Sequence, residues 1–313
     1  MPFAIESALN QTEKPKEIIV VADEAEKVPY KDKVYVVEVK DEKLGPKILE
    51  GVKASSGELI ALLDDDDLFH AKKIEKVKKL FENKEIVAVH NYQEFIDLKG
   101  GVVEENNPIV RYHKKNQPRF QVLLDKKNAF KFWKKYPGIH HNNSSLMVRK
   151  EIFEEYEEVL KKIDLAPDYA IFVLSLLDGK LLHTPEKLTY YRIGTGISQY
   201  ERGDLQKAKG HFCTWNRYME GHYLLYKFVD DPEIKKIAFN SFVNLILKCY
   251  IFEPYTDCNV KFQISYRDLG KYIISAWLSG NRTYLLPTIA FLLIPLIGRK
   301  RVARIAMWMI FGI

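Results

Sequence analysis

Four consecutive aspartates, Asp64 to Asp67, come directly after the apolar run 59–63. Four carboxylates side by side repel one another, so a fold that keeps them together needs a cation or many hydrogen-bond donors. Oxygen ligands at this density suit Mg²⁺ or Mn²⁺ rather than zinc, and these ions usually share their coordination with substrate phosphates. The run therefore indicates a divalent-metal site at the end of a strand.

A second interpretation of the same residues is a solvated acidic loop before the helix expected from about Ala71. Aspartate is common at helix starts because its carboxylate accepts from free backbone N–H groups and the helix dipole favours negative charge. The residues alone leave both interpretations open, so the position of the run in the fold has to decide.

The first hundred residues alternate between strand-like and helix-like patterns. Strands are expected at 17–22, fully buried, and at 34–39, 59–63 and 86–90, and helices at 3–10, 47–56 and through 74–81. This alternation predicts a parallel α/β sheet. Ligands bind beyond the carboxyl ends of the strands in such sheets, and both Asp23 and the aspartate run follow strands. That shared position favours a binding site.

The pattern changes after residue 92. A hairpin turn is expected at 99–101, followed by a long polar stretch to about 137. A strand is then expected at 144–148, helices at 150–163 and 168–177, and extended segments at 181–184 and 188–192. A mobile polar loop is expected at 196–210, with helices beyond. The chain therefore ends in a helical region.

The cysteines and the chain start carry expectations about the compartment. Cys213, Cys249 and Cys258 are odd in number and form no CxxC pair, which favours packing roles in a reducing compartment. No charged segment followed by an apolar one opens the chain, so a part facing the cytoplasm is expected.

The net charge of +6 is concentrated at the C-terminal end. From Lys271 onward there are six basic residues and no acidic one, around the apolar run 284–297. Fourteen residues are short for a bilayer span, which needs about 20. The pattern predicts a helical hairpin on anionic lipid, with packing on the protein's own core as the alternative. The basic residues lack an aromatic platform, which argues against a nucleic-acid surface.

Four stretches together resemble family-2 glycosyltransferases of the GT-A fold. They are residues 7–12 with 17–23, the run 57–67 with its DxD element, residues 143–149, and residues 167–170 with Gly179 and 190–192 downstream. The resemblance covers about residues 3–195. It implies a mixed, mainly parallel sheet flanked by helices, divided into a nucleotide-sugar-binding half (1–98) and an acceptor-binding half (99–200), followed by a helical C-terminal region (201–313).

The resemblance also implies roles for individual residues. The nucleotide would contact Asp23, Lys47, Asp64 and Asp65, Mn²⁺ or Mg²⁺ would bind Asp64 and Asp66, Asp168 would be the general base, and Asn143, His141 and Arg192 would face the acceptor. For Asp168 the alternative is a helix cap after Pro167. His140 and His141 are interpreted as metal ligands or acceptor contacts, or as loop histidines without a function.

Two departures from the family pattern affect the expected activity. The sequence begins inside the family's first helix, without the strand that normally precedes it and helps to hold the nucleotide. Ile193-Gly194 stands where many members carry a histidine, so no metal ligand is expected there. The first departure leaves two explanations open, a misassigned start or a shortened, inactive relative that binds nucleotide or serves as a scaffold.

The preferred function is a metal-dependent, inverting glycosyltransferase with a UDP- or GDP-linked donor and a glycan or lipid-linked acceptor. It is expected to be cytoplasmic and peripherally membrane-associated. Inversion is expected because one carboxylate can take the acceptor proton, with no second, nucleophilic carboxylate. A nucleotidyltransferase or phosphatase is a third interpretation, which no activating glycine-rich loop or phosphatase motif supports.

Overall fold

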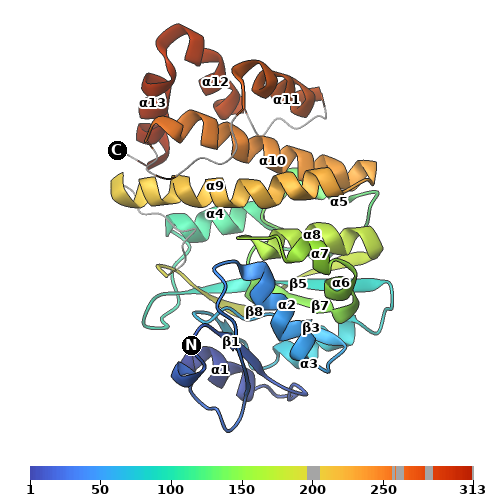
Figure 1. Cartoon of the computed structure of the whole chain (residues 1–313). Coiled ribbons are helices and arrows are strands. Elements are labelled where there is room, and N and C mark those ends of the chain that lie inside the picture. Colours follow the sequence, from blue (N-terminus) through green and yellow to red (C-terminus); the bar gives the residue numbers. More distant parts are fainter. Residues whose placement is uncertain (196–204, 256–257, 259–263, 279–284, 312–313) are drawn as a thin grey trace. The chain divides into compact units, whose positions relative to one another are not determined.

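The computed structural model describes residues 1–195, 205–255, 258, 264–278 and 285–311. The chain divides into two compact units, residues 1–195 and 196–313 (Figure 1). The helices of the first unit are α1 (Pro2–Leu9), α2 (Leu44–Ala54), α3 (Lys73–Leu80), α4 (Pro108–Asn116), α5 (Ala129–Lys135), α6 (Lys150–Glu155), α7 (Glu157–Leu160) and α8 (Pro167–Asp178). Its strands are β1 (Ile19–Ala22), β2 (Tyr35–Glu38), β3 (Leu59–Ala61), β4 (Leu68–Phe69), β5 (Ile86–Ile96), β6 (Val122–Leu124), β7 (Leu146–Arg149) and β8 (Lys180–Arg192).

The main sheet of this unit is built around β5 and β8. Its order is β3-β7-β5-β8-β4, and β6 also pairs with β8. The β5–β8 pairing is parallel and is the longest in the sheet, whereas β3 and β5 pair antiparallel with β7. Almost every residue of β5 is buried, as expected for a strand covered on both faces. The expected mixed α/β architecture is confirmed.

Strands β1 and β2 form a separate parallel pair, with Ile19 opposite Tyr35. All four residues of β1 are half-exposed, so the expectation of a fully buried strand at 17–22 is wrong. The cause is the pairing, because β1 has a described partner only in β2 and therefore lies at a sheet edge. The strand is also shorter than expected, beginning at Ile19.

Helix α2 begins at Leu44, three residues before the predicted start. The N–H of Leu44 donates to the carbonyl of Asp164 at 2.9 Å, and that of Gly45 donates to Ile163 at 3.0 Å. The first turn of a helix has free N–H groups that need such acceptors. A Cβ on Gly45 would lie 1.9 Å from the carbonyl oxygen of Leu160, so only glycine permits this approach.

The segment expected to be a long polar stretch contains α4, β6 and α5. Asn107 starts α4, since its side chain accepts from the N–H groups of Ile109 and Val110. The helix expected at 150–163 is divided at Tyr156 into α6 and α7, and the two extended segments after Gly179 form one strand, β8. The loop predicted at 196–210 lies largely outside the described residues, and residues 205–210 are helical.

The described residues of the second unit form five long helices, α9 (Leu205–Phe228), α10 (Pro232–Phe252), α11 (Tyr266–Leu278), α12 (Leu285–Ile297) and α13 (Arg299–Phe311). Its core is aromatic, with the rings of Phe212 and Phe252 stacked 4.6 Å apart and Phe242 fully buried. The predicted helical C-terminal region is thus confirmed over its described residues.

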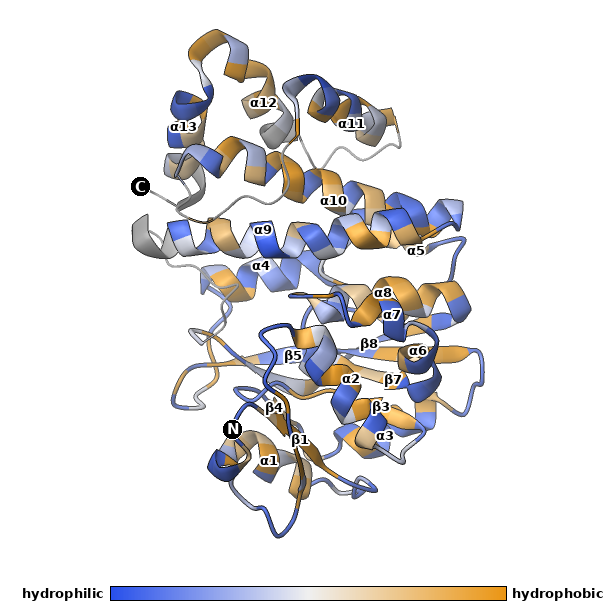
Figure 2. Ribbon diagram, in the orientation of Figure 1, coloured by the Kyte–Doolittle hydropathy of each residue, from blue (hydrophilic) through white to orange (hydrophobic). Residues whose placement is uncertain are grey.

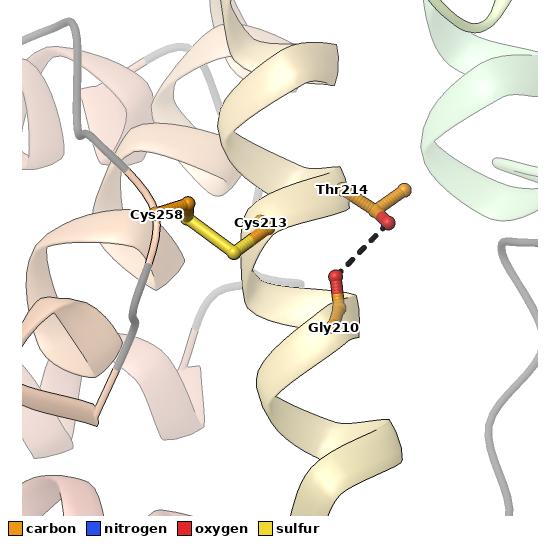
Figure 3. Close-up of a disulfide and its surroundings, with 4 residues drawn as sticks. All are labelled: Gly210, Cys213, Thr214 and Cys258. Carbon is orange, nitrogen blue, oxygen red and sulfur yellow. Dashed lines mark hydrogen bonds between the residues drawn. A yellow bond between two sulfur atoms is a disulfide. The ribbon is translucent and has the colours of Figure 1, made fainter.

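A disulfide joins Cys213 of α9 to Cys258, with the two Cα atoms 5.7 Å apart (Figure 3). The expectation of unpaired, packing cysteines is therefore wrong for two of the three. The two cysteines are separated by 45 residues and form no local motif, so the pairing could not be predicted from their spacing. Cys249 remains a buried thiol, as expected.

Helices α12 and α13 form a hairpin whose two faces differ. Phe291, Val302 and Met307 are buried in the core, whereas Leu296 and Trp308 are 77% and 69% exposed. Figure 2 shows α12 as mainly hydrophobic. Packing on the protein's own core is thus confirmed for one face of the hairpin, and binding of the other face to anionic lipid stays a prediction. No helix within the described ranges is both long and apolar enough to cross a membrane.

Candidate functional site

The aspartate run forms a tight loop between β3 and β4. The N–H of Asp64 donates to Ser144 Oγ at 2.9 Å, and the N–H of Asp67 donates back to the carbonyl of Asp64 at 3.3 Å. The loop therefore returns on itself after the strand, and its four side chains differ in exposure. Asp65 is exposed, Asp64 and Asp66 are partly buried, and Asp67 is buried.

Asp67 serves as an internal acceptor. One carboxylate oxygen accepts from the N–H of Arg192 at 2.8 Å and the other from Nδ2 of Asn142 at 2.5 Å. The Arg192 side chain donates to the carbonyls of Asp66 and Asp97 at 2.8 and 2.7 Å. Arg192, predicted to face the acceptor, thus holds the aspartate loop to the end of β8.

The aspartate cluster carries more negative charge than its protein surroundings stabilise. Burial, followed by repulsion from Asp67, raises the pKa of Asp64 to about 8, although Nδ2 of Asn143 donates to its carboxylate at 3.1 Å. Asp66 and Asp168 repel Asp64 as well. Burial also raises the pKa of Asp67 to about 6. A cation at this place would favour the ionised forms of both groups.

A buried lysine lies behind the loop. Lys73, in the first turn of α3, is fully buried and donates to the carbonyl of Ser144 and, at 3.0 Å, to Thr189 Oγ1. Burial lowers the pKa of Lys73, and Asp67 opposes this effect by attraction. Thr189 Oγ1 also donates to the carbonyl of Ser144 at 2.9 Å. These bonds fix the backbone that supports Asp64.

Asp168 stands in the first turn of α8, after Pro167, where the helix dipole stabilises a carboxylate. Its Oδ2 accepts from the N–H of Asn142 at 3.1 Å and lies 3.5 Å from Nδ1 of His140. Burial tends to raise the pKa of Asp168, but the hydrogen bonds from His140 and from the backbone of Asn142 and Tyr169 hold it below its usual value. Asp168 is thus ready to act as a carboxylate near neutral pH.

Residues 140–143 connect Asp168 to the aspartate loop. His140 and the N–H of Asn142 contact Asp168, the Asn142 side chain contacts Asp67, and the Asn143 side chain contacts Asp64. Asn142 has φ of 82°, a left-handed conformation that asparagine tolerates better than most residues. Such a strained position persists only where its surroundings enforce it, and it often marks a functional site.

A buried polar cluster holds this segment in place. The carbonyl of His141 is contacted by Nε2 of His90 and Nε2 of Gln93, both at 2.9 Å. His90 contacts His183 between their Nδ1 atoms at 2.8 Å. Burial lowers the pKa of His90, His141 and His183, so these rings are neutral. His141, predicted to face the acceptor, therefore belongs mainly to the support of the site.

The two remaining candidates form a pair of their own. Nζ of Lys47, in the first part of α2, lies 2.7 Å from Asp23 Oδ1, beyond the carboxyl end of β1. Asp23 is largely exposed and is thus accessible to a ligand. The structure thus brings together two of the four residues that the resemblance placed around the nucleotide.

The cation-binding expectation concerns Asp64 and Asp66. Oδ2 of Asp66 accepts from Thr195 Oγ1 at 2.5 Å. Across the part of the chain that the structure describes, no three His, Cys, Asp or Glu side chains form a complete metal-binding group. Mg²⁺ commonly takes one or two carboxylates and completes its shell with water and substrate phosphates. The two carboxylates, with Asp64 destabilised as an anion, fit that incomplete kind of site.

Sequence reasoning identified the carboxylates and missed the residues between them. Asn142, Lys73 and Thr195 contact the site without matching any motif that we recognised. The adjacent Asn142 and Asn143 were the available signal, because asparagine is common in turns and tolerates positive φ, which Asn142 adopts here.

Comparison with known proteins identifies the first half of the chain. Residues 1–156 match the profile "Glycosyl transferase family 2". This region belongs to that family. Of the site, the family-2 match includes the aspartate loop, Asp23, Lys47 and segment 140–143, and it ends before Asp168.

Two curated relatives are similar over longer stretches. The chain is 26% identical over 203 residues to an uncharacterized glycosyltransferase, alr2836, of Nostoc sp., covering 61% of this chain and 59% of that relative. It is 26% identical over 237 residues to an uncharacterized glycosyltransferase, MJ1057, of Methanocaldococcus jannaschii, covering 67% of this chain and 76% of that relative. The match to alr2836 thus spans little more than half of that protein.

The fold is also found among solved structures. S. aureus TarS 1-349 in complex with UDP-GlcNAc aligns with a TM-score of 0.58 at 12% identity, over 99% of this chain and 87% of that one. The same protein with UDP aligns with a TM-score of 0.52 at 11% identity, over 85% of this chain and 72% of that one. At this identity the likeness shows the fold alone.

Proposed function

We propose that this chain is an inverting glycosyltransferase that moves a sugar from a nucleotide-sugar donor to an acceptor hydroxyl. One observation carries the proposal. Within a family-2 domain, segment 140–143 links a cluster of destabilised carboxylates to a single carboxylate, Asp168, whose pKa is held low. These are the two halves of a displacement reaction, one for the leaving diphosphate and one for the attacking hydroxyl.

The chain's own residues suit both parts of that reaction. Asp168 accepts the proton of the acceptor hydroxyl as its oxygen attacks the anomeric carbon. Attack from the side opposite the nucleotide inverts the configuration. Asp23 and Lys47 are suited to the donor, since a carboxylate accepts from the N–H groups of a base and an ammonium attracts a diphosphate.

Metal dependence is part of the proposal. Asp64 and Asp66 would hold Mg²⁺ or Mn²⁺ together with the donor diphosphate, and the exposed Asp65 would face the nucleotide. A bound cation supplies stabilisation of the negative charge that develops on the leaving diphosphate. The UDP and UDP-GlcNAc complexes of TarS make a UDP-linked donor the first choice here.

We also propose that the acceptor lies at a membrane surface. The outer faces of α12 and α13 expose apolar side chains, and Lys300, Arg301 and Arg304 are exposed beside them. Apolar side chains rimmed by basic residues bind anionic lipid by insertion and by attraction. The enzyme and a lipid-linked or membrane-associated glycan would then both be confined to the membrane surface.

Titration and turnover together test the proposed function. We expect UDP to bind the full chain by calorimetry more tightly than GDP, and only with Mn²⁺ or Mg²⁺ present. Asp66→Asn should lose the metal-dependent part of this binding. Asp168→Asn should keep nucleotide binding and lose transfer by about 100-fold or more, the usual effect of losing a general base.

Other outcomes would contradict the proposal. Nucleotide binding without turnover of any UDP- or GDP-sugar, even with membrane extracts as acceptor, would favour the inactive relative. Release of pyrophosphate or inorganic phosphate in place of a nucleoside diphosphate would favour the nucleotidyltransferase or phosphatase.

A further inference from the structure

His140 is a histidine of the site to which the proposed reaction assigns no role. It is the first residue of segment 140–143, and its side chain is 13% exposed beside that of Asp168, which is 16% exposed. The ring lies edge-on to His141 at 4.7 Å and against Tyr169 at 5.1 Å, between the centroids. It is therefore confined by aromatic neighbours, with one nitrogen directed toward the carboxylate.

The contact between His140 and Asp168 is longer than a strong hydrogen bond. Nδ1 of His140 lies 3.5 Å from Oδ2 of Asp168 and makes no other hydrogen bond in the structure. A buried nitrogen whose single polar contact is this long is poorly satisfied, so a small movement that shortens the distance would stabilise the site. Catalytic hydrogen bonds are often long before substrate binds and shorten in the complex.

His140 contacts the oxygen of Asp168 that already accepts a backbone hydrogen bond. The same oxygen of Asp168 already accepts from the N–H of Asn142, so one carboxylate oxygen is held by two donors from a single segment. This arrangement restricts the orientation of the carboxylate, together with the backbone N–H of Tyr169, which also donates to it. A general base held in this way loses less orientational freedom when it reacts.

We propose that His140 is a positioning residue for the general base. It donates from Nδ1 to Oδ2 of Asp168, keeps the carboxylate ionised and directs its other oxygen to the acceptor. The inference rests on the proposed function and extends it to a residue that does not touch the donor.

The charges around the pair set the expected pH dependence. Asp168 is faced by His140, by the backbone N–H groups of Asn142 and Tyr169, and by the more distant, repelling Asp64. His140 is faced by Asp168 and by the rings of His141, Tyr169 and Phe172, with His90 behind His141. His90 and His141 are neutral because burial lowers their pKa. The removal of His140 therefore raises the pKa of Asp168.

The test compares His140→Ala with His140→Asn in the full-length protein. The amide nitrogen of asparagine takes nearly the position of Nδ1 and can donate, although it carries no charge. We expect His140→Ala to lower kcat roughly tenfold and to move the acidic limb of the kcat/KM profile to higher pH, with the KM for the donor unchanged. His140→Asn should restore most of kcat. His113→Asn is the matched control, since the ring of His113 contacts His141 and not Asp168, and should leave the acidic limb in place.

A second measurement makes the test independent of turnover. The carboxyl-carbon resonance of Asp168, assigned by its loss in Asp168→Asn, should titrate at higher pH in His140→Ala than in the wild type. An unchanged Asp168 titration would overturn the inference, whatever the activity. Weaker nucleotide binding in His140→Ala, with an unchanged acidic limb, would also overturn it and place His140 at the donor. Absence of wild-type turnover with every donor would contradict the proposed function and not the pairing.

Discussion

At the scale of single residues, the aspartate loop divides its four carboxylates between two tasks. Asp67 is buried and has donors on both oxygens, so it organises the loop. Burial, followed by repulsion from Asp67, raises the pKa of Asp64 to about 8, against the single amide donor from Asn143. A group that is unfavourable as an anion in the protein alone is well suited to a cation that arrives with the substrate.

The raised pKa of Asp64 predicts how stability depends on pH. A pKa of about 8 in the folded state lies above the usual value of about 4, so the folded protein binds the proton more tightly than the unfolded chain. The contribution of Asp64 to stability is therefore present below pH 4 and is lost as pH rises toward 8. In the presence of EDTA, Asp64→Asn should be more stable than the wild type at pH 9, on the order of 1–3 kcal/mol, and little different at low pH.

Thermal unfolding from pH 5 to 9 measures this difference. Mn²⁺ should raise the Tm of the wild type more at pH 8 than at pH 6, because cation binding displaces the proton of Asp64. Asp65→Asn is the matched control, since Asp65 is exposed and should leave the metal-free pH profile unchanged. Parallel pH profiles for the wild type and Asp64→Asn would show that Asp64 ionises normally.

The sequence reveals the acidic residues of the site more readily than their partners. Four adjacent aspartates are recognisable from the sequence alone, and Asp168 follows a proline at a predictable helix start. Lys73 looks like any lysine of the charged face of α3, and its burial depends on Ser144 and Thr189, more than 70 residues away. Long-range hydrogen bonds of this kind have no local pattern, so only the folded structure assigns them.

At the scale of elements, helix α2 is the part whose placement matters most for the proposed donor site. Its start docks on the carbonyls of Ile163 and Asp164, just before α8, through Gly45. Lys47 follows within the same turn and meets Asp23. The contact thus relates the nucleotide-side pair to the loop that leads into Asp168.

Substitution of Gly45 tests this dependence. The Cβ of Gly45→Ala would lie 1.9 Å from the backbone oxygen of Leu160, so the start of α2 must shift. We expect a loss of about 2–3 kcal/mol in urea unfolding and weaker nucleotide binding. Gly210→Ala in helix α9 is the control, because nothing lies within 4 Å of a Cβ added there and the substitution gains helix propensity. Equal effects of the two substitutions would refute the docking role.

Elements with strong periodic patterns were predictable, and short polar ones were not. The apolar sequence of α8 predicted a helix within one residue of the observed one at each end, whereas β5 begins where expected and extends six residues beyond the predicted end. Helix α4 was missed because its sequence is mostly polar and basic, and its start depends on the Asn107 cap. Strand β1 was placed correctly but was assigned the wrong burial, since its apolar sequence does not reveal how many neighbours it pairs with.

At the scale of the whole molecule, the second unit combines a closed core with an outward apolar and basic surface. The described acidic residues of α11 and of the turn after α10 are engaged locally, Asp268 with Lys271 and Glu253 with Arg299. Lys300, Arg301 and Arg304 remain exposed beside Leu296 and Trp308. This surface has the composition expected for reversible contact with anionic lipid.

Flotation with lipid vesicles tests that contact in the full-length protein. We expect binding to vesicles that contain phosphatidylglycerol, weaker binding to pure phosphatidylcholine, and loss of binding at high salt, since the attraction is screened. Leu296→Ser with Trp308→Ser should weaken binding at least tenfold, because each inserted apolar side chain contributes about 1.5–3 kcal/mol. Lys300→Gln with Arg304→Gln should remove only the preference for anionic lipid, at about 1 kcal/mol per charge.

A matched pair in the first unit separates a lipid-binding surface from general stickiness. Phe3 and Leu98 are each 66% exposed, which is comparable to the exposure of Leu296 and Trp308. Unlike those two residues, they lie far in the sequence from the basic cluster 299–304. Phe3→Ser with Leu98→Ser should therefore leave vesicle binding unchanged. If this pair weakens binding as much as Leu296→Ser with Trp308→Ser, exposed apolar side chains act without regard to position. Failure of the unmodified protein to float with anionic vesicles would refute the membrane surface and leave the carboxylate site untouched, because the two features rest on different units.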